Sequence, residues 1–134
     1  MRKAFLLLFL FSISIYAKAG YDLLFCTNAD SLGNCKGKGQ TFEWNGDRTK
    51  LDLVVVNKAG LGVAKLRFMI FFMQNDKEGK LYADLSLALP DERTKYAMKK
   101  IIFYKPGYYK IDVLNANGFL PLATGFVTVT DRKD

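Results

Sequence analysis

Two cysteines are the residues whose type and spacing point most directly to chemistry. Cys26 and Cys35 are the only cysteines among 134 residues, and eight residues separate them. A redox-active pair is typically separated by two residues, and a zinc site would need two further ligands. The residues between the cysteines are polar and include a glycine, as in a hairpin turn. We therefore expect one structural disulfide, Cys26–Cys35.

The absence of histidine narrows the possible catalytic chemistry. It excludes Ser–His–Asp and Cys–His sites, and neither a phosphate-binding loop nor a dinucleotide-binding glycine pattern is present. A pair of carboxylates for glycoside hydrolysis is the remaining option. Asp84 and Asp112 both alternate with apolar residues and would serve if they faced one groove, but the same alternation predicts that they mark the solvent side of strands. We predict no catalytic residue and no cofactor, and a small hydrolase is the least favoured alternative.

The metal-binding patterns are weak. The loop between the cysteines contains Asp30, but Leu32 and Gly39 stand where a calcium-binding EF-hand would need oxygen ligands. Met69 and Met73 are soft ligands suited to copper, yet methionines on one face of a strand more often fill gaps in packing. The sequence therefore predicts no metal site.

The first nineteen residues have the pattern of an export signal. A basic start, Met1–Lys3, is followed by an apolar run of 13 residues, Ala4–Tyr16, and by the small residues of Ala17–Ala19. The alternative is an uncleaved anchor, but the apolar run is shorter than the roughly 20 residues that span a bilayer. We expect a signal peptide at 1–19, a mature domain at 20–134 with no membrane span, and a periplasmic or secreted protein.

The positive charge is weak evidence for a nucleic-acid partner. The formal charge of +7 falls to +4 without the leader, and the only tight basic pair is Lys99–Lys100. A nucleic-acid-binding protein would concentrate its charges in a stripe. We expect no nucleic-acid partner.

Most of the mature chain alternates between apolar and polar residues, which is typical of half-buried strands. The segment 96–104 is ambiguous, because Met98, Ile101 and Ile102 would also line one face of a helix; its β-branched and aromatic residues favour a strand. Residues 90–98, which overlap the start of this segment, are open to strand, loop or short helix. About seven or eight strands at short spacing predict an all-β, antiparallel sandwich. The expected strands lie within 40–44, 50–57, 63–74, 80–89, 96–104, 109–113 and 119–130.

The last thirty residues resemble the end of an immunoglobulin-like sandwich. A proline–glycine turn, Pro106–Gly107, precedes an inward Tyr109, an alternating strand, a second turn at Asn117–Gly118 and a valine-rich last strand. The resemblance implies an immunoglobulin-like topology and transfers no activity. It departs from antibody domains, because the two cysteines are too close in sequence to bridge the sheets and Val113 supplies no cysteine after the tyrosine.

The run 63–74 is apolar on both faces, whereas a sandwich buries one face of each strand. Its outward residues would lie beside those of the two last strands. The candidate partner-binding patch consists of Met69, Phe71, Met73, Tyr108, Leu114 and Phe126. Contiguous apolar surface usually marks an interaction site, but a loop, the 90–98 segment or an N-terminal strand would also account for it by covering this face.

Three function classes follow. The leading one is an exported, non-catalytic binding or structural module that contacts a protein partner, or a second copy of itself, through the apolar sheet face or a sheet edge. The second is a domain that binds carbohydrate or another small ligand, suggested by Trp44 beside a turn. The third is the carboxylate hydrolase.

Overall fold

The computed structural model is all-β in the part of the chain that it describes. The predicted leader lies outside that part, apart from Tyr16–Ala17. The described residues are 16–17, 20–30, 32–74, 77–118 and 120–131.

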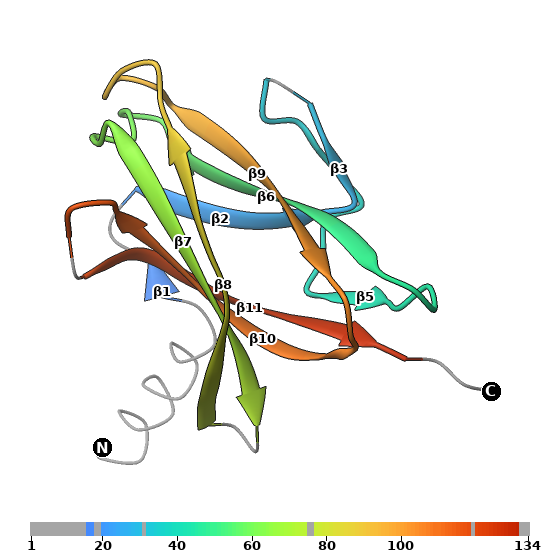
Figure 1. Cartoon of the computed structure of the whole chain (residues 1–134). Helices are drawn as coiled ribbons and strands as arrows, with labels where there is room; N and C mark the ends of the chain where they lie inside the picture. Colours follow the sequence, from blue (N-terminus) through green and yellow to red (C-terminus); the bar gives the residue numbers. More distant parts are fainter. Residues whose placement is uncertain (1–15, 18–19, 31, 75–76, 119, 132–134) are drawn as a thin grey trace, which may run out of the picture.

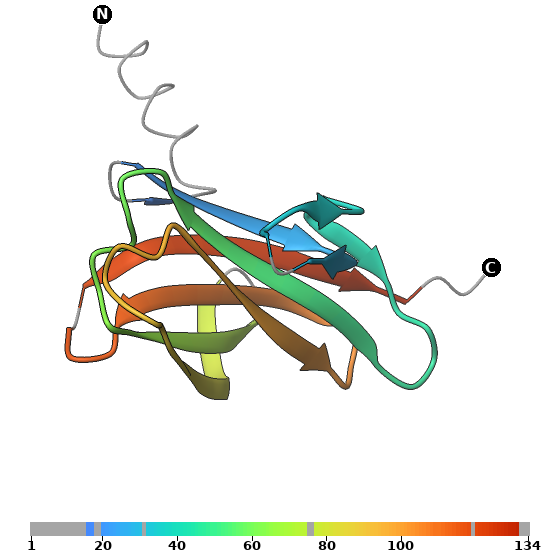
Figure 2. The ribbon, with the colours of Figure 1, turned by 90° about the horizontal axis from the view of Figure 1, so that it is seen from above.

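Two sheets pack face to face (Figures 1 and 2). The large sheet contains, in spatial order, β1 (Tyr16–Ala17), β11 (Pro121–Thr130), β10 (Gly107–Asn115), β7 (Lys65–Gln74) and β8 (Lys77–Ala88), with β5 (Thr41–Glu43) also on β11. The small sheet contains β2 (Tyr21–Cys26), β6 (Thr49–Asn57) and β9 (Tyr96–Phe103), and β3 (Asn28–Ala29) pairs with β4 (Cys35–Lys36) in a separate hairpin. Eight of these described strands have three or more residues, as the sequence predicts.

One pairing departs from the antiparallel pattern. Strand β5 runs parallel to β11, with Thr41 opposite Thr128. The chain leaves the small sheet after β2 and reaches the free edge of β11 in the same direction as that strand. The predicted sandwich is therefore confirmed, with this parallel edge as the difference.

The core lies between the sheets and follows the predicted alternation. The inward side chains of the central strands are fully buried. They are Leu51, Leu53 and Val55 on β6, Leu66, Phe68 and Ile70 on β7, and Tyr109, Ile111 and Val113 on β10. The ambiguous segment is strand β9, which pairs with β6 along its whole length. Its odd-numbered residues Ala97, Ile101 and Phe103 are buried, a period of two that a helix would not produce.

Tyr109 points inward, as the immunoglobulin-like resemblance implies, and its hydroxyl bonds back to the turn before β10. Its hydroxyl donates to the Lys105 carbonyl oxygen at 2.7 Å, four residues upstream. Its ring centroid lies 4.6 Å from that of Phe103 and 5.2 Å from that of Tyr82. A buried tyrosine whose hydroxyl bonds back to the backbone at the start of this strand is typical of such sandwiches.

The hairpin β3–β4 covers part of the outer face of the small sheet. Cys26 and Cys35 form a disulfide that ties the hairpin to β2, as predicted. The Ala29 amide donates to Asp52 Oδ2 on β6 at 2.8 Å. Asp52 and Val54 are consequently buried, although they face away from the core. Disulfides persist in oxidising compartments, which fits a location outside the cytoplasm.

Replacing both cysteines by serine is expected to lower the free energy of unfolding by roughly 2–3 kcal/mol, the loop-closure term for a loop of about ten residues. Urea unfolding followed through the single tryptophan, Trp44, measures it. Wild type in reductant is the control and should match the variant. Equal stability of the variant and the oxidised wild type would contradict a stabilising disulfide.

Candidate functional site

The outer face of the large sheet carries most of the residues predicted to bind a partner. Strand β7 lies between β8 and β10, and β11 follows β10. Phe71 is opposite Lys110 on one side and Leu81 on the other, and Lys110 is in turn opposite Phe126. Tyr108 is opposite Met73 in the adjacent row. We call the apolar outward side chains of these two rows the apolar band: Phe71, Met73, Leu81, Tyr108 and Phe126.

The band is held together by ring contacts. Tyr108 and Phe126 stack with their centroids 5.6 Å apart and their planes 12° apart. The ammonium of Lys110 lies 5.2 Å from the centroid of Phe71, within the range of a cation–π contact. Leu81 and Tyr108 are 49% and 38% exposed, and the other three side chains are half-buried. The band is thus a partly open apolar strip that crosses four strands.

Leu81 belongs to the band because of a β-bulge, which simple alternation does not reveal. The alternation of β8 places Leu81 on the same face as Ala83 and Leu85. The pairing with β7 shifts between Ile70 and Phe71, so that Tyr82 is the extra residue. Tyr82 turns inward against Tyr109, and Leu81 turns outward beside Phe71. A bulge reverses the faces of the residues that follow it up to the next irregularity, which here lies between Phe71 and Met73.

Leu114 does not lie on the open surface. It is 5% exposed, and Val113 beside it is also buried. The pairing of β10 with β11 shifts between these two residues, where Leu122 is the extra residue on β11. On β10 itself the alternation continues, because Leu114 lies opposite the outward Arg67 on β7. Leu114 is therefore on the outer face, as expected, but it is buried and does not belong to the open surface.

Met69 shares the outer face but sits in a polar row. It lies opposite Asp84 on β8 and Asp112 on β10. Met69 is half-buried between these two acidic positions. Met69 and Met73 are therefore separated by the row that contains Phe71.

The two carboxylates flank Met69 without forming a catalytic pair. They lie on the strands either side of β7, which are about 10 Å apart; this is well beyond the separation of about 5 Å in a retaining glycosidase and near the upper end of the roughly 6.5–9.5 Å in an inverting one, so their chemistry depends on their partners. Arg67 donates to both oxygens of Asp84, at 2.9 and 2.6 Å, and holds the pKa of that carboxyl below its usual range. Asp112 accepts from the Thr124 hydroxyl at 2.7 Å and lies 3.5 Å from Lys110 Nζ. A general acid would need a raised pKa, and Asp84 has the opposite shift.

Trp44 does not form an open platform for a sugar ring. Its side chain is partly buried against the hydrophobic core. Its amide donates to the Thr130 carbonyl oxygen at 2.8 Å and so extends the contact of β5 with β11. The position therefore gives the carbohydrate hypothesis no support.

Neither a metal-ligand cluster nor a membrane-length helix occurs in the described residues. Within those ranges, no three His, Cys, Asp or Glu side chains gather as metal ligands. In the loop between the cysteines, Asp30 instead accepts hydrogen bonds from Leu32 and from Asn34, each at 2.9 Å. No helix in the described part is long and apolar enough to cross a bilayer.

Comparisons with known proteins give distant likenesses only. No protein-family model matches the chain, and no curated protein matches it. The CARDB domain of a Pyrococcus furiosus protein, solved in complex with di-metal ions, aligns at 15% identity and a TM-score of 0.47, covering 87% of this chain and 97% of that one. The C-terminal domain of Wzt aligns at 12% identity and a TM-score of 0.47, covering 90% of this chain and 78% of that one. Values this low do not bear on what the chain binds, so its function is inferred from its own residues.

Proposed function

We propose that this protein is an exported, non-catalytic binding module that contacts a protein partner, or a second copy of itself, through the apolar band. The observation that carries the proposal is the run of outward apolar side chains across β8, β7, β10 and β11. Aromatic residues and methionine are the types enriched at the centres of protein interfaces. The leader pattern and the disulfide support export.

The composition of the band suits recognition by another protein. Tyr108 and Phe126 present a stacked pair, and Phe71 carries a cation on its ring. The row of Asp84, Met69 and Asp112 borders the band on one side, with Arg67 paired to Asp84. An apolar centre with a charged border is the usual anatomy of a protein interface.

Replacing Phe71 by glutamate tests the proposal. Because Phe71 is half-buried and Lys110 lies over its ring, we expect the free energy of unfolding to fall by about 1 kcal/mol or less. Partner binding should weaken at least tenfold, as for a residue at the centre of an interface. Sedimentation velocity over a concentration series measures self-association, and quantitative co-purification from the native envelope fraction measures a partner.

The matched control is Ala88→Glu, an exposed position at the far end of β8 on the same outer face. It introduces the same charge outside the band and should leave association unchanged. A loss of several kcal/mol of stability on Phe71→Glu would show that Phe71 belongs to the core. Equal binding by wild type and both variants would show that the apolar band is not an interface.

A further inference from the structure

A seam runs between β8 and β9, the outermost strands on the same side of the two sheets. The Asn57 amide donates to the Lys95 carbonyl oxygen at 2.8 Å, so the odd-numbered residues of β9 bond to β6. In an antiparallel ladder, alternate residues direct their main-chain groups to opposite sides. Tyr96, Met98 and Lys100 therefore direct theirs across the free edge. Within the described part of the chain, these main-chain groups have no partner across that edge.

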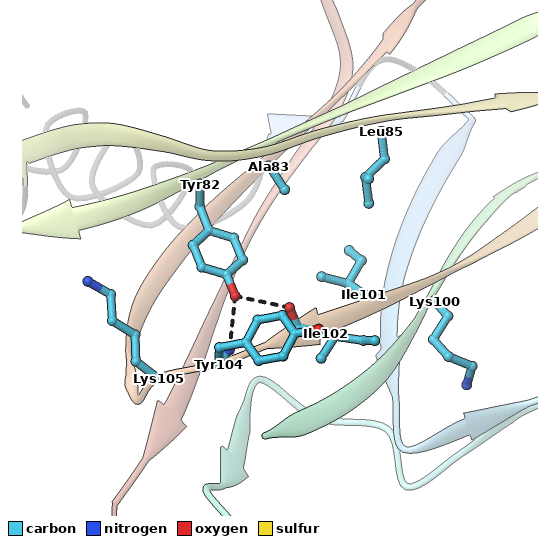
Figure 3. A pocket seen from close by; sticks show the side chains of 8 residues that line it. All are labelled: Tyr82, Ala83, Leu85, Lys100, Ile101, Ile102, Tyr104 and Lys105. Atoms are coloured by element: carbon cyan, nitrogen blue, oxygen red, sulfur yellow. Dashed lines mark hydrogen bonds between the residues drawn. The ribbon is translucent and has the colours of Figure 1, made fainter. Parts of the chain in front are cut away.

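Side chains bridge the seam at two points. At one end, the Tyr82 hydroxyl donates to the Ile102 carbonyl oxygen at 3.1 Å and accepts from the Tyr104 amide at 2.9 Å (Figure 3). Further along, Lys99 Nζ donates to the Ser86 carbonyl oxygen at 3.1 Å. The two edges are thus joined by side chains and not by a ladder of main-chain hydrogen bonds.

A cavity opens on each side of the Lys99 bridge. The first measures about 480 Å³, and Figure 3 shows Ala83, Leu85 and Ile101 facing it from the two strands. The second measures about 500 Å³ and is lined in part by Leu87, Leu89 and Ala97. Both therefore offer apolar walls beside a free strand edge.

Positive side chains line both cavities, although Lys100 is paired with Asp52 and Arg93 lies 4.0 Å from Asp91. The first cavity is lined by two lysines and the second by an arginine and a lysine, and no carboxylate lines either; the four cations are Arg93, Lys95, Lys100 and Lys105. Lys99 is a fifth cation, and its side chain faces inward. As an odd-numbered residue of β9 it shares the inner face with Ala97 and Ile101, both buried. A strand that fills the seam would have to satisfy an inward ammonium.

We propose that β9 accepts an extended peptide segment of a partner protein, which becomes the fourth strand of the small sheet. Main-chain hydrogen bonds to Tyr96, Met98 and Lys100 would supply affinity, as in strand addition. The inward side chains of an added strand recur at every second residue. Its pattern is therefore apolar, any, acidic, any, apolar: the apolar residues enter the two cavities, and the acidic residue replaces the Ser86 carbonyl as the acceptor of Lys99.

The experiment uses a fluorescein-labelled peptide with the core Thr-Val-Thr-Asp-Thr-Val-Thr, titrated with the full chain and followed by anisotropy. We expect saturable binding that is at least tenfold tighter than that of the same peptide with lysine at the central position. Of two peptides N-methylated at alternate residues, only the one that loses the donors facing β9 should lose binding. No saturation up to 1 mM protein, or equal binding of the aspartate and lysine peptides, would overturn the proposal.

Lys99→Glu is the decisive variant, and its expected result is a reversed preference, with the lysine peptide binding more tightly. Lys65→Glu makes the same charge change at the exposed start of β7 and should leave the preference unchanged. If Lys99→Glu does not fold, Lys99→Gln should reduce the discrimination to less than threefold. An equal effect of Lys65→Glu would show that net charge alone drives binding and would overturn the proposal.

Two further outcomes distinguish binding at the β9 edge from binding at the apolar band and from self-association. Phe71→Glu should leave peptide binding unchanged, because the apolar band lies on the outer face of the large sheet. If binding at one of the two sites is disproved, the proposal for the other site is therefore unaffected. A dimer of the chain that the peptide dissociates would assign the edge to a second copy and overturn the partner-peptide proposal.

Discussion

Replacing the exposed Lys100 by methionine is expected to lower the free energy of unfolding by about 3 kcal/mol, because it leaves a buried carboxylate without its cation. The Asp52 side chain is 2% exposed, and its Oδ1 lies 2.9 Å from Lys100 Nζ. Its other oxygen accepts a hydrogen bond from the Ala29 amide at 2.8 Å. The Lys100 side chain is itself 53% exposed and gains little from the pair. Removing the exposed Lys100 should therefore lower the free energy of unfolding more than removing the Asp52 charge.

Asp52→Asn should cost only about 1 kcal/mol, because the amide oxygen still accepts from Ala29 and Lys100 returns to water. The double variant should resemble Asp52→Asn alone, since no charge is then buried. Urea unfolding at neutral pH gives all three values, with Lys50→Met as the control for loss of an exposed lysine on β6. A smaller cost for Lys100→Met than for Asp52→Asn would show that Asp52 is already satisfied by solvent.

The strands and their inward faces could be predicted because they depend on local alternation. On β6, β7 and β10 the period-two pattern identifies the inward residues correctly, and all of these are buried. The inward direction of Tyr109 was also predictable, because the proline–glycine turn and the tyrosine lie close together in the sequence. These features need no knowledge of which strands are neighbours.

The outer faces could not be predicted in the same way, because they depend on irregularities of the ladders. One bulge brings Leu81 into the apolar band. Leu114 keeps the expected outward position but is buried there. Either side of a bulge looks like regular alternation in the sequence, and only the register with the neighbouring strand shows the shift. All six predicted patch residues occupy outward positions, but Leu114 is buried, and Met69 lies in the row of Asp84 and Asp112.

Residues that are buried by segments distant in the sequence could not be predicted, for a related reason. Asp52 alternates with Leu51 and Leu53, which predicts an exposed position. It is buried because the disulfide-tied hairpin folds back over β6. Lys99 was noted only as half of a basic pair, whereas the pairing of β9 with β6 turns it toward the core. Neither position carries a signal that a single sequence reveals.

Alkaline pH is expected to destabilise the fold between about pH 10 and pH 12 through Tyr109. Burial, with a smaller contribution from Tyr82, raises the pKa of Tyr109 to about 12, whereas an unfolded tyrosine has a pKa of about 10. The folded state holds the proton more tightly, so this contribution to stability is complete below pH 10 and is lost as the pH rises to 12. Two pKa units correspond to about 3 kcal/mol, of which roughly half should be lost by pH 11.

Tyr109→Phe isolates this effect. The variant lacks the hydrogen bond to the Lys105 carbonyl oxygen, so we expect it to be about 1 kcal/mol less stable than wild type at pH 8. It also lacks the titrating hydroxyl, so wild type should lose its advantage by about pH 11, and the two stability curves should cross there. Urea unfolding from pH 8 to pH 11.5 measures both curves, and tyrosines common to both proteins, such as Tyr21, cancel in the difference. Parallel curves would mean that the Tyr109 hydroxyl titrates alike in the folded and unfolded chains, and that burial against Phe103 and Tyr82 does not protect it.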